Sequence, residues 1–203
     1  MKTILLLLVA TGCGRKLVAE TDNCSDQLEC LAADGVSECL DCLPSCQLDY
    51  LPTEDRRHLE TEVDYPVYPP AGGAHNPCWY DFGIFDYEVP DERWVHNQEH
   101  GAVVFLYNCP EGCDGELQAL IEMVSPLERI ILSPYSNMRW RFAATAWEHR
   151  IMMNCLDLDR MHSFYKEHFN NAPEDVASMP SATCMDTEES SEDSGTADTR
   201  ESR

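Results

Sequence analysis

The amino-acid sequence predicts an α+β fold, in which a small mixed or antiparallel sheet packs with two helices and follows a disulfide-rich N-terminal arm. Two observations carry this prediction. Short apolar runs typical of strands alternate with segments of helical periodicity between residues 101 and 169. Ahead of them, five cysteines crowd between residues 24 and 46, where large apolar side chains are few. The order strand, helix, strand, strand, helix is typical of an α+β layer.

The strands are predicted from short apolar runs. Residues 101–107, read as GAVVFLY, combine β-branched and aromatic residues and predict a buried strand. Residues 129–132 predict a second strand, which ends at Ser133 and Pro134. Residues 141–147 predict a third.

The helices are predicted from capping residues and apolar spacing. Asp114 can cap the first helix, which stops near Pro126, and Asp157 can cap the second. Each helix has one apolar face. The apolar positions are Leu117, Leu120, Ile121 and Val124 in the first helix, and Leu158, Met161, Phe164 or Tyr165, and Phe169 in the second.

The chain divides into segments of different composition. Residues 16–50 form the Cys-rich arm, which has too few apolar residues to build a core alone and depends on cross-links. Residues 51–62 are polar and are interpreted as a linker to the main domain, residues 63–179. The acidic tail, residues 186–203, has no large apolar residue and is predicted to be disordered.

The N-terminus, MKTILLLLVATGC, predicts export. Its apolar run, residues 4–10, is shorter than the roughly 20 residues that span a bilayer, so residues 1–12 are interpreted as a signal peptide. Ala-Thr-Gly-Cys resembles the bacterial lipobox, which predicts that Cys13 carries lipid and anchors the protein at the cell envelope. Secretion with a free Cys13 is the alternative.

The other ten cysteines are an even number, which in an exported chain suggests up to five disulfides. Their spacing leaves the pairing open. A zinc cluster at Cys39, Cys42 and Cys46 is an alternative that an oxidising compartment disfavours. The disulfide candidates are Cys24, Cys30, Cys39, Cys42, Cys46, Cys78, Cys109, Cys113, Cys155 and Cys184.

The charge balance limits the partners. Aspartate and glutamate outnumber lysine and arginine by 37 to 14. Such a chain repels nucleic acid and anionic lipid surfaces, so nucleic acid is excluded as a partner. The lipid anchor remains as the predicted membrane contact, and the sequence identifies no protein partner.

Residues able to bind a metal gather between positions 75 and 100. His96, Glu99 and His100 form the pattern HxxEH, whose spacing places all three side chains on one side if residues 95–100 form a helical turn. His75 follows two glycines, which let its loop approach closely. Imidazoles and a carboxylate are common ligands of transition metals, so zinc or copper is the expected cofactor at these four residues.

Other interpretations of these residues stay open. HxxEH is also the inverted zinc-peptidase signature, so a zinc-dependent envelope hydrolase could use Glu99 as general base, with Glu167 as a further ligand. That motif belongs in a long helix, whereas here Gly101 follows at once. Alternatively, the histidines and Glu99 make structural hydrogen bonds in a non-catalytic structural or interaction lipoprotein with an aromatic surface. Enzymatic activity is uncertain, and the non-enzymatic interpretation is preferred.

Residues outside this group are given structural roles. Thioethers are soft ligands that copper accepts, but core filling is the expected role of Met138, Met152 and Met153. The remaining histidines of the linker and the last helix are expected to face solvent: His58, His162 and His168.

Residues 63–173 resemble the bacterial family known as domain of unknown function 3105. The resemblance rests on five segments in order: YPPAGGAH at 68–75, FGIFDYEVPD at 82–91, VHNQEHGAV at 95–103, LSPY at 132–135 and ATAW at 144–147. It implies export or tethering at the cell envelope, and it implies no established activity.

The sequence departs from the family pattern in two respects. Where Asn97 and Gln98 stand, the family is closer to Ser-Leu, which raises the question of how a polar Gln98 packs. Four cysteines look like added structural cross-links, and the three-residue gap in the second pair disfavours a redox role: Cys78, Cys155, Cys109 and Cys113.

Overall fold

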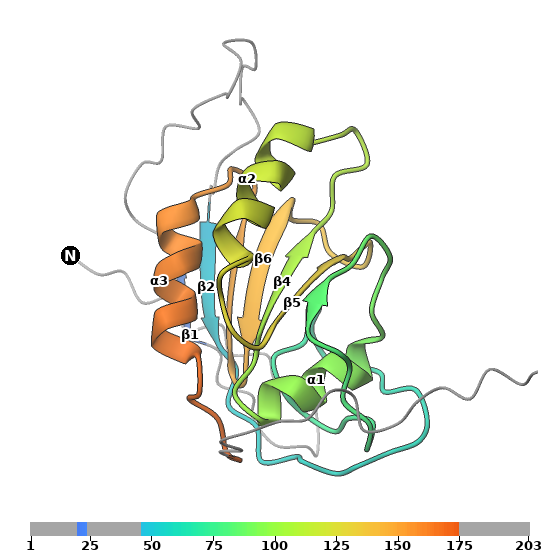
Figure 1. The fold of residues 1–203 in the computed structure, drawn as a ribbon. Helices are drawn as coiled ribbons and strands as arrows, with labels where there is room; N and C mark the ends of the chain where they lie inside the picture. The colour runs from blue at the N-terminus through green and yellow to red at the C-terminus, as the bar shows by residue number, and fades with distance from the viewer. Residues whose placement is uncertain (1–19, 24–45, 175–203) are drawn as a thin grey trace, which may run out of the picture.

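The computed structural model describes residues 20–23 and 46–174. Its strands form one seven-stranded sheet in the order β1-β2-β7-β6-β4-β5-β3 (Figure 1). Both β3 and β4 run parallel to β5, and the other neighbouring strands are antiparallel. The strands are β1 Glu20–Asn23, β2 Cys46–Tyr50, β3 Gly83–Ile84, β4 Val103–Tyr107, β5 Ile130–Pro134, β6 Phe142–Ala146 and β7 His149–Met153. The predicted α+β class with a mixed sheet is confirmed.

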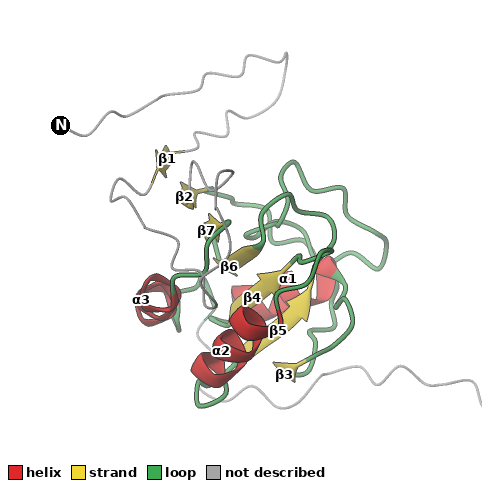
Figure 2. Ribbon diagram, turned by 90° about the horizontal axis from the view of Figure 1, so that it is seen from above, coloured by secondary structure: helices red, strands yellow, loops and turns green. Residues whose placement is uncertain are grey.

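The described helices lie on both faces of this sheet. They are α1 Asp91–Glu99, α2 Asp114–Val124 and α3 Leu158–His168. Apolar residues of α2 and α3 share one buried cluster, whereas Trp94 and Val95 of α1 belong to a second cluster. Figure 2 shows α2 and α1 on opposite sides of β4 and β5. Among the described helices, none is both long enough and apolar enough to cross a membrane.

Strand β4 is buried on both faces. Val103 and Phe105 point into the cluster under α2 and α3, and Val104 and Leu106 point into the cluster under α1. Side chains alternate along a strand, so a strand covered on both sides has a continuous apolar run. This arrangement accounts for the continuous apolar run at residues 101–107, GAVVFLY.

The predicted helices need one correction. Asp157 caps α3 as predicted, because its carboxylate accepts a hydrogen bond of 3.0 Å from the backbone N–H of Arg160. Asp114 is the first residue of α2 instead of its cap, and Cys113 holds the cap position without a side-chain hydrogen bond. The helix therefore gains only the favourable charge of Asp114 in its first turn.

Strands β1, β2, β3 and β7 were not predicted from the sequence. The pairing of β2 with β7 buries an ion pair, in which Nη2 of Arg150 lies 2.7 Å from Oδ2 of Asp49. Arg150 also donates to the backbone carbonyl of Pro69 at 2.9 Å. A buried arginine interrupts the apolar pattern from which a strand is predicted. The aspartate that makes its burial possible is distant in sequence, so the residues around Arg150 do not reveal it.

Several expectations lie outside the described residues. These are the signal peptide, the acidic tail and the cysteines Cys13, Cys24, Cys30, Cys39, Cys42 and Cys184. Cys46 lies in β2, and its backbone alone is described.

Candidate functional site

The candidate site begins on the last turn of α1. This helix has nine residues, so the HxxEH pattern occupies the end of a regular helix and not the single turn expected from the sequence. Asp91 and Glu92 in its first turn stabilise the positive end of the helix dipole. His96, Glu99 and His100 are all buried, and Gly101 then turns the chain into β4 at φ +82°.

A loop brings His75 against this helix end. Segments 57–59 and 75 pair like strands, since the N–H of His75 donates to the carbonyl of Arg57 at 3.0 Å and that of Leu59 donates to the carbonyl of His75 at 2.8 Å. The loop requires glycine at position 72 for two reasons. Gly72 has φ +112°, and a Cβ on it would lie 3.0 Å from the Thr53 side chain. The pairing places His58 beside His75.

Four of these side chains converge. His58, His75, His96 and Glu99 each offer one donor atom, and the four atoms lie within 4.8 Å of one another. Oε2 of Glu99 lies 3.0 Å from Nε2 of His75 and 3.9 Å from Nε2 of His58. His75, His96 and Glu99 are buried, whereas the His58 side chain is 51% exposed. The cluster therefore has three buried members, His75, His96 and Glu99, and one half-exposed member, His58.

Backbone carbonyls fix the tautomers of the two buried histidines. Nδ1 of His75 lies 2.8 Å from the carbonyl oxygen of Gly73, and Nδ1 of His96 lies 2.8 Å from that of Asn76. A carbonyl oxygen only accepts, so each Nδ1 carries the proton and each Nε2 of the neutral ring keeps its lone pair. In metal sites such a bond orients the ring for ligation through the other nitrogen.

The environment favours the protonation states that bind cations. Burial, together with the nearby His75 and His100, lowers the pKa of His96 to about 4. Burial also lowers the pKa of His100, against the attraction of Glu174 and Glu99. Burial acts to raise the pKa of Glu99, but the contact with His75 and the surrounding histidine charges outweigh it and lower that pKa. At neutral pH His96 is therefore a neutral imidazole and Glu99 a carboxylate, which are the forms that ligate a cation.

His100 continues the cluster on its other side. Its Nε2 lies 3.0 Å from Nε2 of His96, whose lone pair accepts the N–H. Its Nδ1 lies 3.9 Å from Oε2 of Glu174, a residue beyond α3. Glu99, His100 and Glu174 form a second set of donors within 4.8 Å of one another. The four predicted residues therefore lie together, but they divide between two donor sets that share Glu99.

Aromatic and amide side chains hold the walls of the site. The Trp79 ring meets His96 and His100 edge-on, with centroids 5.2 and 5.4 Å apart. Asn97 fixes the loop that carries Trp79, because its amide donates to the carbonyl of Tyr80 at 2.8 Å and accepts from the N–H of Tyr80 at 2.9 Å. The sequence departure at position 97 is therefore part of the support of the site.

Gln98 answers the packing question that the sequence raised. Its side chain is fully buried, and its amide donates to the hydroxyl of Thr145 on the neighbouring strand β6. This hydrogen bond satisfies Nε2, whereas Oε1 is buried without a hydrogen-bond partner among the described residues.

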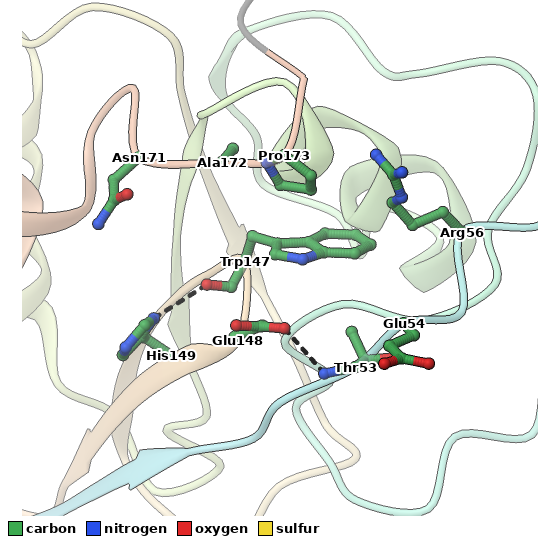
Figure 3. Close-up of a pocket in the computed structure, with 9 residues that line it drawn as sticks. All are labelled: Thr53, Glu54, Arg56, Trp147, Glu148, His149, Asn171, Ala172 and Pro173. Atoms are coloured by element: carbon green, nitrogen blue, oxygen red, sulfur yellow. Dashed lines mark hydrogen bonds between the residues drawn. The ribbon is translucent and has the colours of Figure 1, made fainter.

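A pocket of about 420 Å³ lies beside the donor cluster (Figure 3). Trp147 forms its centre, with Pro173 and Ala172 on one side and Thr53 on the other. Glu148, whose backbone has φ +64°, forms part of the pocket wall. Its Oε1 accepts a hydrogen bond of 2.9 Å from the backbone N–H of Thr53. Two of the residues that line the pocket also approach members of the cluster.

Arg56 and Trp147 make this connection. Arg56 lines the pocket, and its Nε lies 3.9 Å from Oε1 of Glu99. The Trp147 ring meets His75 edge-on at 6.1 Å. None of the four converging donors lines the pocket itself.

Two donors, His58 and Glu174, were not predicted from the sequence, and one further histidine, His168, was predicted in the wrong environment. His58 was expected to face solvent, yet it joins the cluster across the loop pairing while staying half-exposed. Glu174 gave no sequence signal. His168 was also expected to face solvent, but it is buried between Phe164 and His149, with which it stacks at 4.2 Å. Glu167, a possible further ligand, is exposed on α3 and belongs to neither donor set.

The remaining candidates have structural positions. Met138, Met152 and Met153 are buried in the two apolar clusters, as expected for core filling. Cys109 and Cys113 form a disulfide at the start of α2, and Cys78 and Cys155 are also disulfide-bonded.

The loop aromatic residues form no broad exposed surface. Among Trp79, Tyr80, Phe82, Phe85, Tyr87 and Trp94, only Tyr87 is a largely exposed ring, at 51%. This weakens the interpretation of these rings as a partner surface.

Fold and site together define an α+β domain with a buried histidine and glutamate cluster able to hold a metal ion where a helix turns into a central strand. The chain belongs to the family described as "Protein of unknown function (DUF3105)", whose model matches residues 57–182. This confirms the family resemblance predicted from the sequence segments. No curated protein and no solved structure shows significant similarity to the chain.

Proposed function

We propose that this is an exported, lipid-anchored protein of the bacterial cell envelope that binds a divalent transition-metal ion through His58, His75, His96 and Glu99. One observation carries the proposal. Backbone carbonyls hold Nδ1 of His75 and of His96, so Nε2 of each ring keeps a lone pair, and the four donor atoms of His58, His75, His96 and Glu99 lie within 4.8 Å of one another. Structural histidines with satisfied hydrogen bonds do not need this convergence.

The donor set indicates which ion is favoured. Three imidazoles and one carboxylate suit Zn²⁺ or Cu²⁺, whereas Cu⁺ prefers sulfur ligands. The candidate thioethers lie in the core clusters, which removes support for a Cu⁺ site. Zinc is the ion we expect, since four nitrogen and oxygen donors match its usual tetrahedral coordination.

Ligation requires a small movement. Two ligands of one zinc ion lie at most about 4.2 Å apart with bonds of about 2.1 Å, and the four donors lie within 4.8 Å. His58 is half-exposed and can close this gap. The ion also takes the lone pair of His96 in place of the N–H of His100, so that one hydrogen bond is exchanged for a metal bond.

The test is the metal content of the folded protein. Protein stripped with chelator and reloaded with Zn²⁺ should retain zinc after desalting, measured by elemental analysis. The variant His75→Ala/His96→Ala should lose it, and His162→Ala on α3 serves as the control. Circular dichroism verifies that each variant is folded. Wild-type protein that retains no zinc, or a double variant that retains as much as the control, would reject the metal site.

The lipid anchor is tested separately. Mass spectrometry of the N-terminal peptide should find a diacylglycerol-modified Cys13 in membrane fractions of the bacterium, and Cys13→Ser should move the protein to the soluble fraction. An unmodified mature N-terminus, or unchanged membrane association of Cys13→Ser, would leave secretion without a lipid anchor.

A hydrolase is the second candidate, and the pocket beside the cluster supports it. Glu99 lies among the donors, 3.0 Å from His75, which suits a ligand better than a free general base. A metal-bound water would then be the nucleophile. Zinc-loaded protein should cleave members of an ester or peptide library, and His75→Ala should abolish turnover. Absence of turnover by the loaded protein would leave metal binding as the function.

A further inference from the structure

A short segment after α3, residues 170–174, returns to the C-terminal end of α1. The N–H of Asn170 donates to the carbonyl of Gly101 at 3.0 Å, and the N–H of Glu174 donates to the carbonyl of Glu99 at 3.1 Å. We call this segment the strap. It brings the carboxylate of Glu174, the last residue that the structure describes, to the histidine and glutamate cluster.

The strap faces a buried nitrogen that has no hydrogen-bond partner. His100 is 7% exposed, and its Nδ1 makes no hydrogen bond with any described residue. The N–H of this ring is on Nε2, which donates to His96 at 3.0 Å, so Nδ1 bears a lone pair. That lone pair lies 3.9 Å from Oε2 of Glu174. A lone pair and a carboxylate oxygen repel each other unless a cation lies between them.

An arginine now supplies the nearest positive charge. Nε of Arg56 lies 3.9 Å from Oε1 of Glu99, and Nη1 of Arg56 lies 3.8 Å from Oε1 of Glu174. Both distances are too long for hydrogen bonds, and the Arg56 side chain is 46% exposed. This loose contact with two carboxylates is weak and easily displaced.

We propose that Glu99, His100 and Glu174 bind a second divalent cation, so that the Glu99 carboxylate is shared between two metal ions. The proposal rests on the first ion at His58, His75 and His96 described above. Oε2 of Glu99 faces those histidines, whereas Oε1 faces Arg56 and the strap. A shared carboxylate is compatible with the separation of about 3.5–4 Å found in two-metal centres.

The second ion replaces Arg56. It takes the position between the two carboxylates that the guanidinium approaches, and Arg56 moves out toward the neighbouring pocket that it lines. This exchange makes Arg56 a competitor of the ion. Removing its charge should therefore strengthen binding of the second ion, whereas removing the charge of Glu174 should weaken it.

The experiment is a calorimetric titration of chelator-stripped, full-length protein with Zn²⁺. Wild type should bind two equivalents, and Glu174→Gln should bind one. Arg56→Gln should bind two, with the second dissociation constant lowered by about fivefold. The matched control is Glu60→Gln, which removes an exposed carboxylate four residues after Arg56. This variant should behave like wild type.

The outcomes separate the two proposals. Wild type that saturates at one equivalent, lost in His75→Ala, would overturn the second ion and retain the first. Wild type that binds no zinc would overturn both. Glu174→Gln that still binds two equivalents would also overturn the second site as assigned.

A spectroscopic measurement checks the shared carboxylate. Loaded with Co²⁺, wild type should show a paramagnetic resonance signal that falls when the second equivalent is added, because two ions joined by one carboxylate couple magnetically. Glu174→Gln should keep the signal of a single ion. Two uncoupled signals would exclude the bridge.

Discussion

At the scale of single residues, the site depends on which ring nitrogen of each histidine carries the proton. His75 bonds to the carbonyl of Gly73 two residues earlier, but His96 bonds to the carbonyl of Asn76, twenty residues away. The HxxEH spacing predicted that His96, Glu99 and His100 share one side of a helix. It does not predict the direction of the lone pairs, because the chain elsewhere supplies the carbonyls.

His168 gives a prediction about acid stability. Burial, and to a lesser degree His149, lowers its pKa from the ordinary 6.5 to about 4. Between these values the unfolded chain binds a proton that the folded chain does not, so stability is full above about pH 6.5 and falls toward pH 4. By this linkage the contribution lost between pH 7 and pH 4.5 is about 2–3 kcal/mol.

The measurement compares unfolding by denaturant at pH 7 and pH 4.5, in the presence of a chelator. His168→Phe, which keeps a ring against His149, should lose less stability on acidification than wild type. His96, whose pKa is also about 4, should keep a residual pH dependence in both proteins. An equal loss in wild type and His168→Phe would contradict the buried neutral state of His168.

Residue-scale prediction was limited by contacts between distant segments. His75, His96, Glu99 and His100 could be predicted because their residue types lie close in sequence. His58 enters through a strand-like pairing, and Glu174 through the strap. Both belong to polar segments whose composition is typical of solvent-exposed chain, so no local pattern distinguishes them.

At the scale of elements, the junction between α1 and β4 positions half of the site. Gly101 has φ +82°, and a Cβ at this residue would lie 2.8 Å from the Cα of Asn170. The glycine thus allows both the turn into β4 and the close crossing of the strap. Any larger residue must displace the strap or strain the turn.

Gly101→Ala should therefore destabilise the protein by about 2 kcal/mol or more. We expect the strap to detach, because the added methyl group collides with backbone atoms that cannot rotate away. Hydrogen exchange at the amides of residues 170–174, measured by mass spectrometry, should become faster, whereas exchange in β4 changes less.

Gly112→Ala is the matched control. Gly112 also has positive φ, at +93°, but no atom lies within 4 Å of an added Cβ. Its cost should reflect backbone strain alone, without a change at the strap. Similar exchange at 170–174 in Gly101→Ala and wild type would show that the crossing is not held by Gly101.

Element-scale prediction succeeded where side-chain patterns were simple. Strands β4, β5 and β6 and the helices α2 and α3 follow from apolar runs and spacing. Helix α1 was underestimated because Asn97 and Gln98 are polar yet buried, each through a partner outside the helix. The signal for β7 was weak for the same reason, since Arg150 is satisfied by Asp49 on β2.

At the scale of the whole molecule, bound zinc should stabilise the folded state. The donors come from residues 58 to 174, so the unfolded chain cannot present them together. At a free zinc concentration one hundred times the dissociation constant, a single site adds about 2.7 kcal/mol. For a domain of this size, the melting temperature should rise by about 5–10 °C.

Thermal melts with zinc and with chelator measure this shift. The shift should be absent in His75→Ala and present in His162→Ala, which keeps the cluster. The net charge of −23 attracts any divalent ion to the surface, so magnesium at the same concentration controls for general electrostatic stabilisation. An equal shift with magnesium would attribute the effect to charge screening instead of the cluster.

The strap also determines when the second donor set, Glu99, His100 and Glu174, can form during synthesis. Glu174 is contributed after every strand and helix that the structure describes, and its backbone closes over the end of α1. A nascent chain that has emerged only as far as α3 lacks this last carboxylate and the backbone closure. The complete set of donors therefore arises only after residue 174 has been synthesised and the domain has folded.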